Sequence, residues 1–212
     1  MTIVVAVKKD NEIIIGADQR CTYGDMILDE YASKILIKEF DIIHYRLPHD
    51  KDQFLIAFSG AYSLFGLLET FEAPSMDDND TFFQYLYKEL IPSLNTHLRR
   101  YNFIQDCNGL EGVDWDLLIV YQDKMYNIEF NLGIIEITSN YFATGTAKDI
   151  AYGSLYTTTY TKIGGDQRKI SPRLQVITAI RACAKHHTKC NDSYKLYHSG
   201  PNEDGEYEIK EV

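Results

Sequence analysis

Short runs of almost uninterrupted apolar residues restrict the fold of this chain more than any other feature. Ile3–Val7, Ile13–Ala17 and Leu117–Val120 are each the length of a strand and contain no charged residue. A strand with one face in water alternates apolar and polar residues, so these runs predict strands that are covered on both faces. The turn formers Asp10–Asn11 and Gln122–Lys124 predict that they belong to hairpins. Two stacked sheets between layers of helices would satisfy this pattern.

Strand and helix patterns occupy separate blocks of the sequence. Strand-like runs fill the first sixty residues, a helical segment follows, strands return at Trp115–Phe142, and helices return between Thr146 and His187. Such blocks favour an α+β fold over alternating βαβ units. A chain of 212 residues can bury roughly 70% of its extended-chain surface. We therefore expect one domain over residues 1–212, built as a four-layer αββα sandwich.

Two helices have a recognisable apolar face. The first spans about Asp80–Tyr101 and is expected to kink at Pro92. Its predicted core-facing stripe consists of Phe83, Leu86, Tyr87, Leu90, Leu94 and Leu98. The second helix begins at Ser171–Pro172, which has the form of an N-cap followed by proline at the first helical position. Its predicted face comprises Leu174, Ile177, Ile180 and Ala184.

Composition and charge argue against several classes of function. The net charge of −10 and the lack of a basic stripe disfavour a nucleic-acid partner. No signal peptide or membrane-length apolar run is present, so a cytoplasmic protein is expected. The cysteines Cys21, Cys107, Cys183 and Cys190 lack paired spacing, which predicts reduced thiols and no zinc site. No cofactor is expected.

Thr2 directly precedes the first apolar run. Methionine ahead of a small residue is generally removed, which would give Thr2 a free α-amine beside its own hydroxyl. The amine has a reference pKa of about 7.7 to 8.0 and can act as base for that hydroxyl. Many inert chains also begin with Met-Thr, so the downstream residues decide whether this one is a nucleophile.

An ordered set of downstream motifs resembles the β-type subunits of the proteasome family. The stretch Asp18-Gln19-Arg20-Cys21-Thr22-Tyr23-Gly24, Lys34, and a strand Phe54–Gly60 that runs into a helix at Ala61–Glu72 follow Thr2 in the family's order and spacing. Tyr141–Thr146 and Leu196–His198 are similar to its later strand-to-helix segment and closing strand. The resemblance spans nearly the whole chain and includes the peptidase of bacterial two-component ATP-dependent proteases. It implies the fold of an N-terminal-nucleophile hydrolase.

The resemblance implies a role for each motif residue. Thr2 would be the nucleophile, Lys34 would lower the pKa of its hydroxyl, and Asp18 would keep Lys34 charged. The backbone N–H of Gly60 would stabilise the oxyanion. Substrate-binding positions would be Arg20, Thr22, Phe58 and Tyr62, of which the last two would narrow the primary specificity pocket and favour small residues.

Three positions depart from the family's pattern. Thr146 stands where many members have a supporting serine and keeps a hydroxyl. Cys190 and His187 stand in place of a serine and an aspartate, which would change the local field around the α-amine. His186 and His187 project to different sides of a helix, so they do not predict a metal site.

Two segments extend beyond a compact family member. Asp41–Asp52, which contains His44, Pro48 and His49, predicts a surface hairpin extension. The acidic loop Met76–Asp80 lacks the glycine and the distal glutamate of a calcium loop and is interpreted as solvated.

The favoured function is that of a threonine-type peptidase subunit in a self-compartmentalising, homo-oligomeric ring or stacked assembly, with an ATP-dependent unfoldase as a possible partner. Two alternatives remain open. One is an amidohydrolase of the same type acting on a small amide, and the other is a non-catalytic assembly or regulatory subunit that retains the pair of Asp18 and Lys34. Retention of Met1 would favour the non-catalytic subunit.

Overall fold

The computed structural model describes residues 3–23, 25–44, 50–107, 110–112, 115–129, 131–160 and 170–212. Its strands are β1 (Ile3–Lys9), β2 (Glu12–Asp18), β3 (Cys21–Tyr23), β4 (Met26–Asp29), β5 (Ile35–Ile43), β6 (Asp50–Gly60), β7 (Met76–Asp77), β8 (Gln105–Cys107), β9 (Leu110–Gly112), β10 (Trp115–Tyr121), β11 (Lys124–Ile128), β12 (Ile134–Ile137), β13 (Tyr141–Gly145), β14 (Tyr194–Pro201) and β15 (Tyr207–Glu211). Its helices are α1 (Ser63–Thr70), α2 (Phe82–Tyr85), the π-helical η1 (Leu86–Leu90), α3 (Ile91–Arg100), α4 (Lys148–Tyr160) and α5 (Pro172–His186). This is the mixed α+β composition that the sequence predicts.

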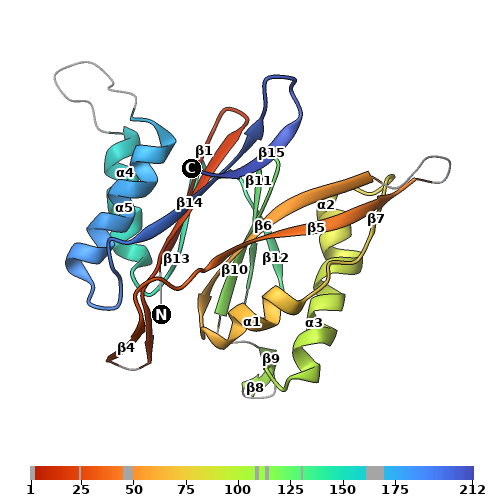
Figure 1. The fold of residues 1–212 in the computed structure, drawn as a ribbon, viewed down its shortest axis with the longest axis horizontal. Helices are drawn as coiled ribbons and strands as arrows, with labels where there is room; N and C mark the ends of the chain where they lie inside the picture. Colours follow the sequence, from red (N-terminus) through yellow and green to blue (C-terminus); the bar gives the residue numbers. More distant parts are fainter. Residues whose placement is uncertain are drawn as a thin grey trace.

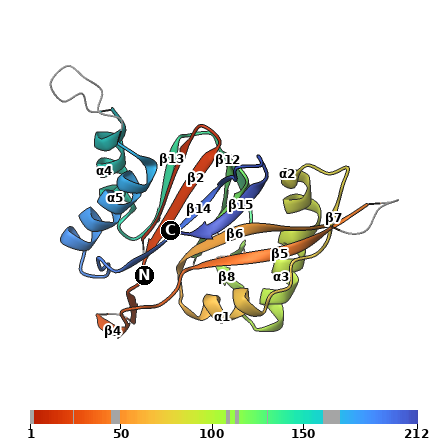
Figure 2. The same ribbon diagram turned by 45° about the horizontal axis from the view of Figure 1, so that its top comes forward.

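The longer strands form two sheets, of five and six strands. The first has the order β13-β1-β2-β14-β15 and the second the order β12-β11-β10-β6-β5-β7, and every pairing is antiparallel except that of β5 with β7. Figures 1 and 2 show β1 and β2 inside the first sheet, with β4 projecting beyond it. The turns predicted at Asp10–Asn11 and at Gln122 are confirmed, and Asp10 and Gln122 adopt the left-handed φ values of 55° and 53°.

Side-chain alternation along β1 explains its uninterrupted apolar sequence. Ile3, Val5 and Val7 pack against α4 and α5, whereas Val4 and Ala6 contact the second sheet. Successive side chains of a strand point to opposite faces, so a strand with two buried faces has no position for a polar residue. The prediction that these strands are covered on both faces is confirmed.

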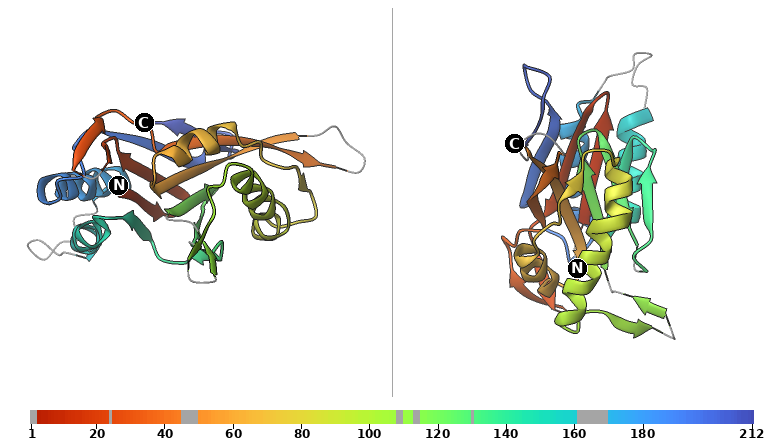
Figure 3. Two further views of the ribbon diagram at one scale, coloured as in Figure 1. Left: turned by 90° about the horizontal axis from the view of Figure 1, so that it is seen from below. Right: turned by 90° about the vertical axis from the view of Figure 1, so that its right-hand side faces the viewer.

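The second sheet is also apolar on both faces. Leu55 and Ala57 of β6 face the first sheet, and Phe54, Ile56 and Phe58 of the same strand contact α1, α2, η1 and α3. In the left view of Figure 3, α2 and α3 lie on the side of the sheets away from α4 and α5. The aromatic side chains make this core dense, because they bury a large area and pack in offset geometries.

The helix after α1 differs from the sequence prediction in phase. Phe82 and Tyr85 are buried upstream of η1, and Leu86 is buried as predicted, whereas the predicted members Phe83 and Tyr87 are 39% and 72% exposed. The prediction was wrong for these two residues because a π-helical turn, closed by the Ile91 N–H bond to the Leu86 carbonyl, shifts the phase by roughly one residue. Leu90, Leu94 and Leu98 follow the shifted phase and are buried, as predicted.

Pro92 lies at the start of α3, immediately after the π-helical turn. Proline has no backbone N–H to donate, so the α-helical hydrogen-bond ladder is interrupted at this position in any case. A π-helical segment precedes Pro92, and the kink predicted at this proline stays a prediction.

The N-terminus of α5 is capped as predicted. Ser171 accepts a hydrogen bond from Leu174 N–H, and Pro172 occupies the first turn. Leu174 itself is exposed, which corrects its predicted place on the core face. The buried face is instead formed by Gln175, Val176, Ile177, Ala179, Ile180 and Cys183.

Gly16 of β2 lets α5 approach the first sheet closely. A Cβ atom added to Gly16 would collide with Leu196 Cδ2 and lie 2.8 Å from Val176 Cγ1. We expect Gly16→Ala to lower the free energy of unfolding by about 1 to 3 kcal/mol, because overpacking displaces side chains in a dense core. Urea denaturation measures this change.

Gly66→Ala is the matched control for that substitution. Gly66 is exposed within α1, and a Cβ there would meet no atom within 4 Å. Alanine is the better helix former, so this variant should gain roughly 0.5 to 1 kcal/mol. Equal effects of the two variants would contradict the close approach of α5.

The predicted hairpin extension is formed by β5 and β6, which pair as far as Ile42 and Asp50. His44 follows β5, and its Nδ1 and Nε2 atoms lie 3.0 Å from Asp78 Oδ2 and 3.2 Å from Asp50 Oδ2. The acidic loop thus contributes Asp78 to a three-residue cluster of His44, Asp50 and Asp78 near the end of the hairpin, which we call the clasp. Pro48 and His49 lie outside the described residues.

We expect the pKa of His44 to lie above the ordinary value of about 6.5, because the charged ring donates hydrogen bonds to the carboxylates of Asp78 and then Asp50. A raised pKa means that the clasp stabilises the fold fully below pH ~6.5 and loses this contribution as pH rises through the folded-state pKa. Titration of the His44 ring by NMR should show a raised pKa, and Asp78→Asn should lower that pKa. Asp204→Asn, in the exposed β14–β15 turn, should leave it unchanged.

None of the helices in the described part of the chain is both long and apolar enough to cross a bilayer. Across the same part, no three His, Cys, Asp or Glu side chains are arranged to hold a metal ion.

Candidate active site

The Asp18 carboxylate lies at the end of β2, where it is 0% exposed. Its Oδ1 atom accepts hydrogen bonds from Ile3 N–H and from Lys34 Nζ, both at 2.9 Å. Its Oδ2 atom accepts from Arg20 N–H at 3.2 Å and from Asn191 N–H at 3.4 Å. Asp18 therefore joins the start of β1 to the buried lysine and to the segment before β14.

Lys34 lies just before β5 and is only 4% exposed. Its ammonium donates to Asp18 Oδ1 and also to the Arg20 carbonyl, at 2.6 Å. Burial lowers the pKa of Lys34, and the negative charge of Asp18 opposes this change. The residues predicted to form an ion pair do so, and the site holds a buried cation beside the beginning of β1.

Thr2 lies outside the described residues, and so does Gly24 of the motif. Ile3, which follows Thr2 in sequence, is bonded through its N–H to Asp18. The described chain thus enters β1 within hydrogen-bonding distance of the carboxylate that holds Lys34.

Gly60 ends β6 at the same edge of the structure. It pairs with Trp115 of β10 and has a φ of 126°, a conformation that side chains disfavour. The neighbouring Ser59 Oγ lies 3.3 Å from Thr144 Oγ1, and Thr144 pairs with Val4 of β1. Gly60 is therefore held near the first residues of β1, and its role in an oxyanion site stays a prediction.

A buried polar chain that the sequence analysis missed links the two sheets at this edge. Thr144 Oγ1 donates to Asp116 Oδ2 at 2.8 Å in addition to contacting Ser59. Each of these residues stands in a strand where its neighbours are apolar. A polar residue inside a buried strand is the only signal in the sequence, and it does not identify the partner.

Arg20 and Thr22 lie on either side of Cys21. The Arg20 side chain has hydrogen-bond partners within the described residues, whereas the Thr22 hydroxyl has none. The Arg20 guanidinium bonds to both carboxylate oxygens of Glu30 at 3.2 Å and to the Thr188 carbonyl at 2.8 Å. Thr22 Oγ1 is buried and has no hydrogen-bond partner among the described residues. The predicted substrate contact of Arg20 would therefore compete with Glu30.

Phe58 and Tyr62, the predicted wall of a specificity pocket, have different environments. Phe58 is 1% exposed within the core that contains α1 to α3, whereas Tyr62 is exposed beside α1. Both rings pack against Phe65, with centroid distances of 6.4 Å and 5.7 Å. Only Tyr62 presents surface to solvent in this structure, and their role in specificity stays a prediction.

The three positions that depart from the family's pattern have different environments. Thr146 is exposed in the turn between β13 and α4. Cys190 is buried near Asp18, and burial raises the pKa of its thiol to about 12, so the thiol is protonated at neutral pH. His187 caps α5, and its Nδ1 atom accepts a hydrogen bond from Lys189 N–H. Together with Cys21 and Cys183, Cys190 is a free cysteine.

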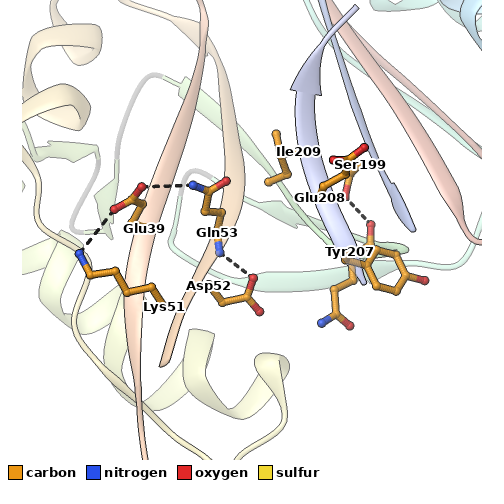
Figure 4. Close-up of a pocket in the computed structure, with 9 residues that line it drawn as sticks. Glu39, Lys51, Asp52, Gln53, Ser199, Tyr207, Glu208 and Ile209 are labelled. Carbon is orange, nitrogen blue, oxygen red and sulfur yellow. Dashed lines mark hydrogen bonds and ion pairs between the residues drawn. The ribbon is translucent and has the colours of Figure 1, made fainter. Parts of the chain in front are cut away.

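Figure 4 shows a pocket that lies away from this site, between strands β5–β6 and strands β14–β15. Its volume is about 240 Å³, and it is lined by Glu39, Lys51, Asp52, Gln53, Gln122, Ser199, Tyr207, Glu208 and Ile209. No predicted site residue is among them. Glu39 already bonds to Gln53 and pairs with Lys51, so the pocket is a polar hollow whose charged groups have partners within the chain.

The fold was compared with known proteins. No family model and no curated protein matches the sequence. Among solved structures, BPH of Thiobacillus denitrificans is 18% identical, with a TM-score of 0.68 over 93% of this chain and 97% of that one. A second structure of BPH, in complex with epoxomicin, gives 0.67 at the same identity and coverage. HslV from Trypanosoma brucei is 13% identical and gives 0.58 over 93% of this chain and 98% of that one. The chain therefore has the fold of HslV-like and proteasome β-type subunits, which confirms at the level of the fold the resemblance seen in the sequence.

Proposed function

We propose that this protein is a threonine-type peptidase subunit of the N-terminal-nucleophile class, with Thr2 as the nucleophile after removal of Met1. The observation that carries the proposal is the buried pair of Lys34 and Asp18, which shares an oxygen with Ile3 N–H. A buried ammonium requires a partner and is retained at a cost, so its position beside the first strand calls for a reason. Activation of a nucleophile at Thr2 is such a reason.

The proposed reaction is hydrolysis through an ester intermediate. The α-amine of Thr2 takes the proton of its hydroxyl, and the oxygen attacks a peptide carbonyl. The Gly60 N–H stabilises the resulting oxyanion, a contact whose loss costs about 2.7 to 4 kcal/mol in hydrolases. The peptide C–N bond breaks, the leaving amine takes a proton, and water then hydrolyses the ester to release the acid and regenerate Thr2.

The three hydrophobic cores support the finer architecture of the proposal. One core lies between α4–α5 and the first sheet, one between the two sheets, and one between the second sheet and α1–α3. This order supports the proposed four-layer αββα sandwich in a single domain over residues 1–212. BPH, a protein of this fold, forms a complex with epoxomicin, which supports a ligand site in this chain as well.

The proposed setting is an oligomer that encloses the active sites. We propose a homo-oligomeric ring or stacked assembly in the cytoplasm that hydrolyses proteins or peptides, with an ATP-dependent unfoldase as a possible partner. Exposed tyrosines such as Tyr23, Tyr31 and Tyr156 could serve subunit contacts, because tyrosine is enriched at interfaces.

A non-catalytic subunit is the second candidate, and Cys190 is the observation that favours it. A protonated thiol at this position is a weak hydrogen-bond partner, and His187 does not contribute the carboxylate that the family's pattern has. In that case the pair of Asp18 and Lys34 would be an ordinary buried ion pair.

The intact mass of the natively expressed protein, measured together with turnover of fluorogenic peptides, tests the proposal. We expect a mass that lacks Met1 and measurable hydrolysis. Retained Met1 would contradict the proposal and favour the non-catalytic subunit. Loss of Met1 with hydrolysis only of small amides would point to the amidohydrolase.

A further inference from the structure

A closed set of hydrogen bonds lies behind the ion pair of Asp18 and Lys34. It joins three segments that are distant in sequence, residues 18–20, 30–34 and 188–191. Asn191, which is buried, provides the central side chain. Its Oδ1 atom accepts from Gln19 N–H at 3.2 Å, and its Nδ2 atom donates to the Glu30 carbonyl at 3.0 Å and to Glu30 Oε2 at 2.7 Å.

Glu30 passes this connection on to Arg20. Its two carboxylate oxygens accept from Arg20 Nε and Nη2, a bidentate geometry that fixes orientation as well as distance. Arg20 Nη1 donates to the Thr188 carbonyl at 2.8 Å, which returns the set to the segment that contains Asn191. The backbone of residue 20 is therefore tied to both other segments.

The backbone carbonyl of Arg20 also accepts a hydrogen bond from the lysine. Lys34 Nζ donates to the Arg20 carbonyl at 2.6 Å, in addition to Asp18. Residues 30–34 belong to no helix or strand, because β4 ends at Asp29 and β5 begins at Ile35. The loop that carries the lysine is held to residue 19 by the Ala32 N–H, which donates to the Gln19 carbonyl. Its end is held to β6 by the Phe58 N–H, which donates to the Lys34 carbonyl.

We propose that Asn191 and Glu30 are positioning residues of this site, which hold the Lys34 ammonium and the Asp18 carboxylate in register through side-chain contacts that strand pairing does not supply. The proposal rests on the proposed peptidase function for its consequence in turnover. Asn191 reaches the ion pair through its N–H bond to Asp18 Oδ2. Glu30 reaches it through Arg20, whose carbonyl accepts from Lys34 Nζ.

Asn191→Ala should lower kcat for a fluorogenic peptide about 10- to 100-fold and change KM by less than about 3-fold, because a misplaced catalytic group slows the chemical step more than it weakens substrate binding. Asn202→Ala is the matched control. Asn202 Oδ1 likewise accepts hydrogen bonds from backbone N–H groups, those of Asp204 and Glu206. Asn202 lies beyond the far end of β14, so its replacement should leave both constants unchanged.

Rescue distinguishes positioning from general support of the fold. Asn191→Asp would place a carboxylate against Glu30 and should lower kcat at least as much as Asn191→Ala. Adding Glu30→Gln to Asn191→Asp supplies a donor amide to the new carboxylate and should raise kcat about 10-fold above the single variant. A double variant no better than Asn191→Asp would contradict the proposed contact.

Crystal structures of the wild type and of Asn191→Ala give a result that does not depend on activity. We expect the distance from Lys34 Nζ to Asp18 Oδ1 to exceed about 4 Å in the variant, the limit of an ion pair. An unchanged distance with unchanged kcat would overturn the positioning role. A displaced lysine in a protein whose wild type hydrolyses no peptide would overturn the peptidase function and leave the positioning role intact. If Asn191→Ala does not fold, Glu30→Gln, at a half-exposed side chain, carries the same two measurements.

Discussion

Thr2→Ala is expected to reduce peptide hydrolysis at least about 10³-fold, because it removes the proposed nucleophile and leaves the rest of the chain unchanged. The residual rate would reflect binding and the Gly60 N–H alone. Initial rates with fluorogenic peptides measure the change, and the melting temperature of the variant should match that of the wild type. A loss of this size with an unaltered fold would assign the chemistry to residue 2.

Thr2→Ser is the matched control for this prediction. Serine keeps the hydroxyl and, after removal of Met1, the α-amine, so substantial activity should remain. Undiminished turnover in Thr2→Ala would show that another residue is the nucleophile and would refute the proposed mechanism.

Lys34→Met is expected to have the second largest effect, because it removes the cation from a buried pair and leaves Asp18 charged in the interior. Breaking such a pair costs about 3 to 5 kcal/mol of stability. Peptide turnover should fall to background as well, since Lys34 provides the buried ammonium that is paired with Asp18. Denaturant titration and rate measurements on the same preparation test both effects.

Two further variants separate the charge from the loss of packing. Lys8→Met removes the same kind of side chain from the pair of Lys8 and Asp123, whose side chains are 28% and 32% exposed, and should cost less than about 1 kcal/mol. Asp18→Asn combined with Lys34→Met should recover much of the lost stability but none of the turnover. Equal destabilisation by Lys8→Met and Lys34→Met would refute the view that the interior charge dominates.

The strands could be predicted because a few consecutive residues are enough to indicate that both faces of a strand are buried. Ile3–Val7 carries the two-sided pattern within five residues, and the turn at Asp10 is marked by its own side chains. The phase of the helix at Phe82 could not be predicted, because a π-helical turn changes which residues face the core without an obvious change in composition. The burial of Leu174 was wrongly predicted for a related reason. Periodicity predicts the spacing of the residues on a buried helix face but not the residue at which that face begins.

The ion pair of the site could be predicted, whereas its surroundings could not. Asp18 and Lys34 stand at the spacing that the family resemblance implies. Asn191 and Glu30 are polar residues in loops, where such residues ordinarily favour turns, and they meet only because three distant segments converge. No local pattern reports a contact across so much intervening chain.

The order of strands in the first sheet bears on how the protein is made. β2 takes its second neighbour from β14, so one edge of this apolar strand stays open until residues 194–201 have left the ribosome. Asp18 likewise lacks the donor from Asn191 until then. A nascent or prematurely terminated chain would therefore expose the unpaired backbone N–H and C=O groups of β2, to which chaperones can bind. The Asp18 carboxylate of such a chain would also lack one of its hydrogen-bond donors.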